Sequence, residues 1–567
     1  MSTADKANQV QQPAHVPDAL VYAFDYNTDP EYCRDPHARA ADLVERAPPI
    51  FWTPYNGGHW MFQSHAAVAE ALRDYGTFSS EHFAPEAFNA MMAELPEEER
   101  IPAPVPICID PPLHAKLRQP LFSTFSPKAV AAMETKIRAL AERLIDAIAQ
   151  QGHCEFQQAV ADVYPVEIFL AMFGLPIEKE REYRDLAKSH LKSITPDLSE
   201  NMMMMQSIAA VMRETIIARR DDRRDDLISL LWGLEIEGEP MALDLMLSYC
   251  VILFIAGLDT VVNALGFGVR HLASDPELQK TLRARPDLIP KATEELLRRY
   301  AFVAPIRILK RDTVFSGVQL KEGERVMMFL PGASVDASVY PDPLRFDLER
   351  TNQPHMAFGS GPHFCLGMHL ARLELRVMYE TLLRKLPEFR LDPDQAPAFH
   401  GSIIAGPTSI HLVWGAGAKR PAAAASRQQA APAADTVPVP AAASATFSAA
   451  PSAAPAATAG AVNAGPPASI EGVWTVTIYG PTGPQETTLE LALVNGALGG
   501  TQAALGQVEK VDEIAYDSRT GKVSWVNKIS KPLPLKLKFD GVVEGGSMNG
   551  KIKASIMGSF PFTAVRH

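Results

Sequence analysis

A single cysteine, Cys365, lies among glycines directly before a strongly helical stretch at residues 368–384. At a helix N-terminus, free backbone N–H groups and the positive end of the helix dipole favour a thiolate over a thiol. Thiolate is the form of cysteine that ligates iron. A lone cysteine is more often a plain core residue, so this placement by itself leaves both a core residue and a metal ligand open for Cys365.

A second group of polar residues interrupts the most apolar run of the chain, residues 245–258. Ala256, Gly257, Leu258, Asp259 and Thr260 combine a helix-weakening glycine with an acid and an alcohol. A threonine inside a helix often donates a hydrogen bond to the carbonyl four residues earlier and bends the helix. In the structural interpretation, these polar residues do no more than this. The functional interpretation is a polar notch that handles protons within a buried helix.

The order and spacing of these residues resemble one known family. Residues 358–367 match the pattern FxxGxHxCxG, which resembles the haem-binding signature of the cytochromes P450. The Ala-Gly-x-Asp-Thr sequence resembles the oxygen-binding helix of that family, Glu295 and Arg298 resemble its structural ExxR element, and the turn-rich residues 340–350 resemble its meander. The resemblance covers about residues 19–414 and is greatest, at residues 254–263 and 294–298, to the camphor hydroxylase branch.

The resemblance implies haem b as the cofactor, with Cys365 as the iron ligand. It implies that Thr260 and Asp259 are catalytic, the first as a hydrogen-bonding group beside the iron and the second in proton supply. Propionates are anions that need cationic or donor partners when buried. The cofactor-binding residues implied by the resemblance are His114, Arg118, Ala256, Thr260, Arg307, Phe358, Gly359, His363, Cys365 and Gly367.

The positions that line the substrate pocket by analogy are all apolar. They indicate a compact hydrophobic substrate with few polar anchors, such as a terpenoid or a small aromatic molecule. Two departures from the camphor hydroxylase branch, the absence of a tyrosine in residues 101–109 and Pro305 in place of an aspartate, mean that camphor itself is not implied. The predicted pocket residues are Ile252, Ile255, Ala256, Val303 and Ile404.

The expected reaction is monooxygenation with O2, two electrons and two protons. The chain contains no GxGxxG fingerprint and no iron–sulfur cysteine spacing, so we expect electrons from an external ferredoxin and ferredoxin reductase. One alternative is a peroxide-driven peroxygenase, against which the Asp259–Thr260 pair weighs. Another is a non-catalytic haem or ligand sensor whose C-terminal part is the binding module.

The overall composition limits the binding partners and the cellular compartment that we expect for this chain. A hydrophobic content of 47% and a charged content of 21% are typical of a folded globular protein, and a net charge of −12 argues against nucleic acid as a partner. The five cysteines are widely spread and odd in number, which suits a reducing cytoplasm. The first 20 residues lack an apolar segment, so we expect no membrane contact there. The run at residues 245–258 is shorter than the roughly 20 residues that span a bilayer, so we expect it to be a buried helix and not a membrane span.

The predicted fold class is mainly α, a cytochrome P450 fold with small β-sheets, followed by an all-β small barrel or sandwich. Helical periodicity predicts helices at residues 129–150, 203–220, 277–283 and 288–300, and alternation predicts strands at residues 50–53, 59–63 and 325–330. The expected organisation is a flexible N-terminus at residues 1–18, a haem domain at 19–414, an Ala- and Pro-rich linker at 415–469 and an antiparallel β-barrel-like domain at 470–567.

Three further features carry smaller predictions. In the C-terminal domain, which is compatible with a lipocalin-like ligand carrier, tight hairpin turns are expected at Asn495-Gly496, Asp540-Gly541 and Asn549-Gly550. The run Met202 to Met205 suits either a mobile lid or, more simply, a helix face. Residues 219–226 alternate arginine and aspartate pairs and are expected to be a solvated, self-neutralising loop.

Overall fold

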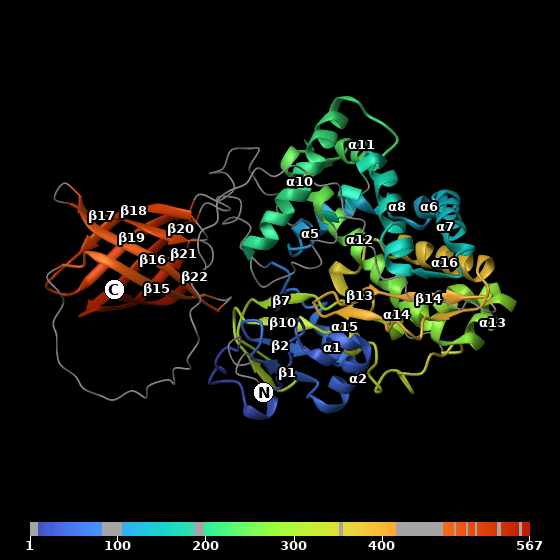
Figure 1. Cartoon of the computed structure of the whole chain (residues 1–567), viewed down its shortest axis with the longest axis horizontal. Coiled ribbons are helices and arrows are strands. Elements are labelled where there is room, and N and C mark those ends of the chain that lie inside the picture. The colour runs from blue at the N-terminus through green and yellow to red at the C-terminus, as the bar shows by residue number, and fades with distance from the viewer. Residues whose placement is uncertain are drawn as a thin grey trace, which may run out of the picture.

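The computed structural model contains a helical part and a C-terminal β-barrel (Figure 1). The residues that it describes are 9–81, 105–179, 181–183, 185–186, 198–236, 238–350, 355–415, 469–480, 483–494, 497–504, 507–529, 535–554 and 558–566. Most of the predicted linker, residues 416–468, and the predicted turn Asn495-Gly496 lie outside this set.

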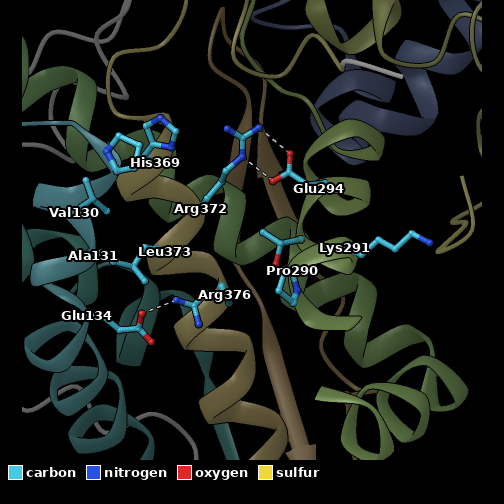
Figure 2. A pocket seen from close by; sticks show the side chains of 12 residues that line it. Val130, Ala131, Glu134, Pro290, Lys291, Glu294, His369, Arg372, Leu373 and Arg376 are labelled. Carbon is cyan, nitrogen blue, oxygen red and sulfur yellow. Dashed lines mark hydrogen bonds and ion pairs between the residues drawn. The ribbon is translucent and has the colours of Figure 1, made fainter. Parts of the chain in front are cut away.

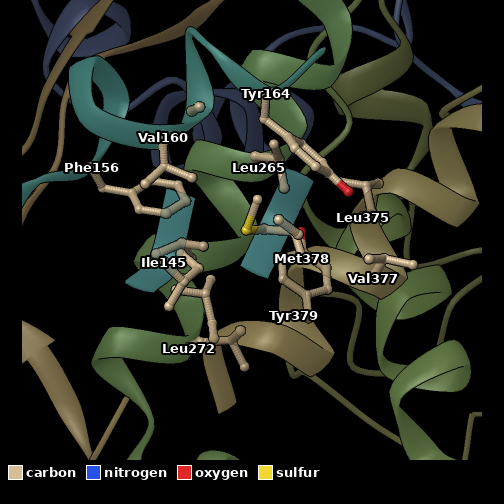
Figure 3. Packing of buried hydrophobic residues seen from close by; sticks show 14 of the residues in the cluster. Ile145, Phe156, Val160, Tyr164, Leu265, Leu272, Leu375, Val377, Met378 and Tyr379 are labelled. Atoms are coloured by element: carbon tan, nitrogen blue, oxygen red, sulfur yellow. The ribbon is translucent and has the colours of Figure 1, made fainter. Parts of the chain in front are cut away.

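The helical part is organised around one long helix, α12 (Leu243–Ser274), which packs against α8, α10, α14 and α16. Figure 3 shows how side chains from α7, α8, α12 and α16 interdigitate to form the main apolar core. The helices of eight or more residues are α2 (Pro36–Arg46), α7 (Glu134–Ala149), α8 (Tyr164–Phe173), α10 (Leu198–Asp221), α12 (Leu243–Ser274), α13 (Pro276–Ala284), α14 (Ile289–Arg299) and α16 (Met368–Lys385).

Short helices connect the long ones. The predicted helix at residues 129–150 is two helices, because the chain breaks at Met133 between α6 and α7. The other three predicted helices correspond to α10, α13 and α14. The short α-helices are α1 (Pro30–Arg34), α3 (His65–Ala71), α5 (Leu113–Arg118), α6 (Pro127–Ala132), α11 (Leu227–Trp232) and α15 (Leu330–Ala333), and the remaining single turns are η2 (Asp18–Leu20), η4 (Gln119–Phe122), η5 (Gln157–Ala161), η6 (Ile177–Lys179), η7 (Pro286–Leu288) and η8 (Gly361–His363).

A five-stranded sheet lies beside the helices in the order β1-β2-β10-β7-β3. All three predicted strands belong to it, although the third ends two residues early because Leu330 begins α15. The strands of the helical part are β1 (Ile50–Thr53), β2 (His59–Phe62), β3 (Phe78–Ser79), β4 (His153–Glu155), β5 (Glu235–Ile236), β6 (Glu239–Pro240), β7 (Ile306–Leu309), β8 (Thr313–Phe315), β9 (Val318–Leu320), β10 (Arg325–Met328), β11 (Phe389–Leu391), β12 (Ala398–His400), β13 (Gly406–Ser409) and β14 (His411–Trp414).

Helix α12 is longer than the apolar run predicted from the sequence. It continues for 32 residues, past Asp259, because the residues after the notch return to an apolar pattern. It is the one helix among the described residues that is long and apolar enough to cross a membrane, and 61% of its most apolar window is buried. That burial is typical of a core helix, as expected.

The prediction that residues 219–226 form a solvated loop is wrong for the first and the last residue of the run. Arg219 lies in α10, Asp226 caps the N-terminus of α11, and their side chains form a buried ion pair with an N···O distance of 2.7 Å. Burial opposes ionisation of Asp226, but the hydrogen bonds from Arg219 and Ser229 hold the pKa of that carboxyl below its usual value. The ion pair joins two helices, so only the middle of the run is exposed.

The methionine run lies in α10. Of its four side chains only that of Met205 belongs to the described set, where it packs against the apolar cluster around α12. This contact agrees with a helix face.

The C-terminal part is a closed antiparallel barrel in which each strand pairs with the next and β15 pairs with β22. The prediction of a barrel is therefore confirmed. Its strands are β15 (Gly472–Gly480), β16 (Gly483–Val494), β17 (Ala497–Ala504), β18 (Gln507–Tyr516), β19 (Lys522–Ile529), β20 (Leu535–Glu544), β21 (Ser547–Ala554) and β22 (Gly558–Arg566).

Two of the predicted hairpin turns are wrong. Asp540-Gly541 lies inside β20, Asn549-Gly550 lies inside β21, and the turn between these strands is at Gly545 and Gly546. The glycine at 550 meets a packing need, because a Cβ there would lie 2.6 Å from the ring of Phe562. These glycines make room for an aromatic core and do not form turns.

Candidate functional site

The loop that carries Cys365 is closed by its own backbone. The N–H of Cys365 donates to the carbonyl oxygen of Phe358 at 3.0 Å, and the N–H of Phe364 donates to Gly361 at 3.1 Å. Gly359 and Gly361 have φ angles of 73° and 72°. At Gly361 a side chain is excluded outright, since a Cβ would lie 2.3 Å from the carbonyl oxygen of Leu72.

This loop ends at Gly367, the N-cap of α16, so Cys365 lies two residues before the cap. Burial raises the pKa of the Cys365 thiol, while the backbone N–H of Gly367 and the charges of Arg118 and Arg372 act to lower it. Burial of Cys365 therefore opposes the thiolate form that its place before a helix favours. A cationic metal replaces the proton of such a thiol, which restores the thiolate.

Two histidines predicted from the resemblance lie side by side. The ring centroids of His114 and His363 are 4.1 Å apart, and the Nε2 atom of each is buried without a hydrogen-bond partner among the described residues. Burial and then the charge of Arg118 lower the pKa of His114 to about 4. Burial and then His114 lower the pKa of His363 to about 3. Both rings are therefore neutral near pH 7.

Two guanidinium groups complete this cluster. Arg307 on β7 is 7% exposed and donates to the carbonyl oxygen of its neighbour Ile306 at 2.8 Å, and Arg118 on α5 donates to the carbonyl oxygen of Phe364. In the part of the chain that the structure describes, neither guanidinium forms an ion pair with a carboxylate. The nearby Asp110 is already engaged by Lys310 at 2.8 Å.

The cluster fits the propionates of haem. Buried cations and donors without acceptors are costly unless an anion satisfies them. Space is present at the loop as well, because a Cβ at Gly359 or Gly367 would meet no atom within 4 Å. Cys365, His114, Arg118, Arg307 and His363 would therefore hold the iron and the carboxylates of haem, with Phe358, Gly359 and Gly367 beside its ring.

Helix α12 presents an open stretch at the predicted notch. Ala256 and Gly257 are exposed in the middle of a core helix, which indicates space beside them. The hydroxyl of Thr260 donates to the carbonyl oxygen of Ala256 at 2.9 Å, as the structural interpretation requires. This bond leaves the oxygen of Thr260 free to accept another hydrogen bond.

Asp259 is 3% exposed. Burial, and next the charge of Asp162, raise its pKa well above the usual value for an aspartate. The neutral carboxylic acid is therefore favoured, and a neutral acid is able to donate a proton. The notch thus places a proton donor and a hydroxyl on adjacent residues.

The predicted pocket residues fall into two groups. Ile252, Ile255 and Ala256 lie on one side of α12 because they are three and four residues apart. Val303 and Ile404 are half-buried partners in an isolated antiparallel bridge. The structure brings together the members of each group.

The ExxR element has the expected structural role. Arg298 donates two hydrogen bonds of 2.8 Å to the carboxylate of Glu295, and both side chains are buried. Glu295 also accepts from Arg350 at 3.0 Å, and Arg298 donates to the carbonyl oxygen of Ser334 at 2.8 Å. The pair ties α14 to the meander that precedes the cysteine loop.

A second network near the loop was not predicted. Arg372 on α16 forms two hydrogen bonds with Glu294, at 2.7 and 2.8 Å, and lies 4.7 Å from the ring centroid of Phe358. His355 also bonds Glu294, at 3.1 Å. These partners are 78 and 61 residues apart in sequence, so no local pattern links them.

This network borders a surface pocket of about 470 Å³ between α6, α14 and α16 (Figure 2). Arg372 points to Glu294 at one end of the pocket, and Arg376 points to Glu134 farther along α16. The pocket starts at His369, two residues after the end of the cysteine loop at Gly367. It therefore lies on the cysteine side of the predicted cofactor.

Comparison with known proteins gives a consistent result. A family model described as Cytochrome P450 matches residues 183–405. Over 411 residues the chain is 33% identical to probable cytochrome P450 127A1 of Sinorhizobium fredii (strain NBRC 101917 / NGR234), and the match spans 71% of this chain and 96% of the relative. Over 341 residues, 58% of this chain and 90% of the relative, it is 33% identical to a steroid C26-monooxygenase of Mycobacterium tuberculosis (strain CDC 1551 / Oshkosh).

Solved structures agree. The crystal structures of CYP101J2 and of cytochrome P450 CYP101C1 each superpose with a TM-score of 0.64 at 31% identity, and each covers 72% of this chain and 100% of the solved chain.

Proposed function

The chain belongs to the cytochrome P450 family, and from this premise we propose that it is a monooxygenase that hydroxylates a compact hydrophobic molecule with electrons from an external ferredoxin and ferredoxin reductase. One oxygen atom of O2 enters a C–H bond of the substrate and the other leaves as water, which consumes two electrons and two protons. Bound haem supplies the chemistry that activates dioxygen.

One observation carries the proposal: the exposed pair Ala256 and Gly257 lies beside the buried carboxyl of Asp259, whose pKa burial raises, and the hydroxyl of Thr260 on α12. Burial favours the neutral acid of Asp259, which is able to donate a proton from its carboxyl oxygen, and Thr260 offers an oxygen atom that orients the group receiving it. This arrangement favours a reaction that needs protons beside the cofactor over one driven by peroxide.

The residues proposed for the substrate pocket contribute only apolar side chains: Ile252, Ile255, Ala256, Val303 and Ile404. Such a lining binds by shape and apolar area, with few polar anchors. The names of two relatives, steroid C26-monooxygenase and vitamin D(3) 25-hydroxylase, widen the candidate substrates from terpenoids and small aromatics to steroid-like molecules.

The alternative of a ligand sensor with a lipocalin-like barrel receives little support. The barrel interior contains Trp474, Trp525, Phe539 and Phe562, each at most 1% exposed. A barrel of eight strands is just wide enough for side chains of this size to fill it. We therefore propose a role for the barrel other than carrying a small ligand.

We propose the organisation expected from the sequence: a haem domain at residues 19–414, preceded by residues 1–18 and followed by a linker at 415–469 and the barrel domain at 470–567. We also propose a cytoplasmic location, without nucleic acid or membrane as a partner. We place docking of the ferredoxin on the cysteine side of the haem domain, where α16 begins.

The test is reconstitution of the purified, haem-loaded chain. We expect no product from NADH and a panel of terpenoids, aromatics and steroids unless a ferredoxin and its reductase are added. Substrate binding is followed separately by the shift of the haem Soret band. Product formation with NADH alone, or with hydrogen peroxide alone at an equal rate, would contradict the proposed electron supply.

A further inference from the structure

Among the described residues of the barrel, the outer wall is the surface considered for interactions, because the interior is filled. Its interior is closed by stacked aromatics, with the Trp525 and Phe539 ring centroids 4.4 Å apart. The buried Gln502 is bonded within the same core, since the indole N–H of Trp525 donates to Gln502 at 3.0 Å and the amide of Gln502 donates to Thr487 at 2.8 Å.

The charges of the barrel are divided between two halves of its sequence. Residues 470–517, which include β15 to β18, contain seven Asp and Glu but one Lys. Residues 522–554, which include β19 to β21, contain seven Lys but two Asp and Glu. The whole barrel is nearly neutral, so the net charge of −12 lies on the rest of the chain. Strands β19 to β21 are thus a basic sector on an acidic protein.

Within this sector like charges face each other. The register places Lys538 of β20 directly opposite Lys553 of β21, and both side chains are exposed. Lys551, also exposed, lies opposite Asp540, whose carboxylate is 3.5 Å from the ammonium group of Lys538. Like charges directly across a sheet are destabilising. Asp540 offsets part of this repulsion, and an anionic partner would offset the rest.

On the cysteine side of the haem domain, several basic side chains of α16 are engaged in ion pairs. Besides Arg372, which is bonded to Glu294, the arginine Arg376 on α16 bonds Glu134 at 2.8 Å and Glu380 at 3.0 Å. Lys385, at the end of the helix, bonds Asp146 at 2.6 Å. Paired charges exert little attraction at a distance, and the acidic haem domain as a whole repels an acidic partner.

We propose that the basic sector formed by β19, β20 and β21 captures the electron-donor protein, a small acidic iron–sulfur protein, and delivers it to the haem domain. The proposal rests on the proposed function, because it assumes an external ferredoxin. Covalent attachment to the enzyme turns capture into a raised local concentration of the donor at the haem domain. The barrel then supplies electrostatic steering that the paired charges of α16 do not.

The chemistry of the sector favours an acidic protein over nucleic acid or a membrane. The aromatic residues of these three strands are Trp525 and Phe539, and both point into the core. Single-stranded nucleic acid is bound through exposed aromatics, and membrane surfaces through apolar side chains that insert beside the basic ones. A wall of lysines without exposed aromatics, and with Val542 as its exposed large apolar side chain among the described residues, suits a hydrated, carboxylate-rich protein surface.

The test compares full-length, haem-loaded variants. Lys551→Glu/Lys553→Glu reverses the sector, Lys551→Arg/Lys553→Arg keeps its charge, and Lys510→Glu/Arg519→Glu is a charge-matched control at other exposed positions of the barrel. With an acidic [2Fe–2S] ferredoxin and its reductase at low ionic strength, the first variant should raise the KM for ferredoxin about five- to tenfold and leave kcat at saturating ferredoxin unchanged. The other two should match the wild type.

Ferredoxin binding without turnover is measured by calorimetry on the same proteins. The reversal should weaken binding and remove most of its salt dependence. Equal ferredoxin affinity in wild type and reversal variant would overturn the proposal, as would an equal loss in the charge-matched control. It would also be overturned if the reversal abolished binding to phosphatidylserine vesicles or DNA while ferredoxin affinity stayed the same. Binding of ferredoxin without any ferredoxin-dependent product would instead contradict the proposed function alone.

Discussion

His114 and His363 lie in contact, with ring centroids 4.1 Å apart, and each has a buried Nε2 atom that no described residue satisfies. One histidine comes from α5 and the other from the cysteine loop, so the contact joins two elements that are distant in sequence. Together with Arg307 and Arg118 they form a cluster of donors that an anion would complete.

The first prediction concerns this cluster. Because haem propionates would accept hydrogen bonds from it, His363→Phe should fold but retain haem less well, with the apparent affinity lowered about tenfold, the loss of roughly one charge-assisted hydrogen bond. Haem transfer to apomyoglobin measures the rate of loss. His355→Phe, a histidine that bonds Glu294 instead, is the comparison and should lose haem at the wild-type rate.

The second prediction concerns the iron ligand. The reduced carbon monoxide complex of the wild type should show the red-shifted Soret band of thiolate-ligated haem, and Cys365→His should lose it because imidazole replaces sulfur. Cys250→Ser, a change at a buried cysteine of α12 away from the loop, should keep the band. A variant at 365 that kept the shifted band would disprove the assignment.

The third prediction separates the two interpretations of Thr260. Thr260→Ala should bind haem and substrate but divert reducing equivalents to hydrogen peroxide, because the hydroxyl no longer orients the proton acceptor. Thr260→Ser keeps a hydroxyl and should keep most of the coupling. Oxygen consumed per product is the measurement, and an unchanged ratio in Thr260→Ala would leave only the bond to Ala256 as the role of this residue.

The cysteine loop and the notch were predictable because their signals are local. The glycines, the histidine and the cysteine fall within ten residues, and the steric exclusion at Gly361 explains why that glycine is needed. The bond between Arg372 and Glu294 was not predictable, because its partners are brought together only when α16 packs against α14. The ion pair of Arg219 and Asp226 was not predicted for a related reason. A run of charged residues suggests an exposed segment, whereas these two side chains lie at two helix ends that bury the pair.

In the barrel, too, local patterns were more predictable than packing between distant residues. Alternation predicted a β-domain, since period two is a property of each strand by itself. The antiparallel order was inferred from the turn pairs. The pairs Asp540-Gly541 and Asn549-Gly550 were mistaken for turns, because a turn signal and a glycine that admits the Phe562 ring look alike in sequence.

The fourth prediction is a loss of stability at the ExxR pair. Arg298→Ala leaves the buried Glu295 with Arg350 as its remaining cation, so the free energy of unfolding should fall by about 3–5 kcal/mol. Urea unfolding with the haem Soret band and the far-UV signal measures it. Arg285→Ala breaks an exposed pair with Asp287 and should leave the unfolding curve unchanged. Similar curves for the two variants would contradict the structural role of the ExxR pair.

The fifth prediction is a pH dependence of stability from His59 on β2. Burial and then the charge of Arg325 lower the pKa of His59 to about 3, below the value of about 6.5 in an unfolded chain. As the pH falls below 6.5 the unfolded state binds the proton first, so stability present above pH 6.5 is lost progressively towards pH 3. The slope is about 1.4 kcal/mol per pH unit for one such histidine.

His59→Leu should flatten the pH profile by that slope between pH 6 and pH 4.5, measured as the free energy of unfolding in urea. Part of the slope should remain, because burial also lowers the pKa of His37 to about 3. A variant profile parallel to that of the wild type would show that His59 is protonated in the folded protein.

Closure of the barrel has a consequence for how the protein behaves at high concentration. Because β15 pairs with β22 from Trp474↔Arg566 to Ile478↔Phe562, the described strands leave no outer row of unpaired backbone amides. Open sheet edges are where separate chains add strands to one another, and a continuous ring offers no such template. The C-terminal part should therefore stay a discrete body in a crowded solution, without exchanging strands or seeding fibrils.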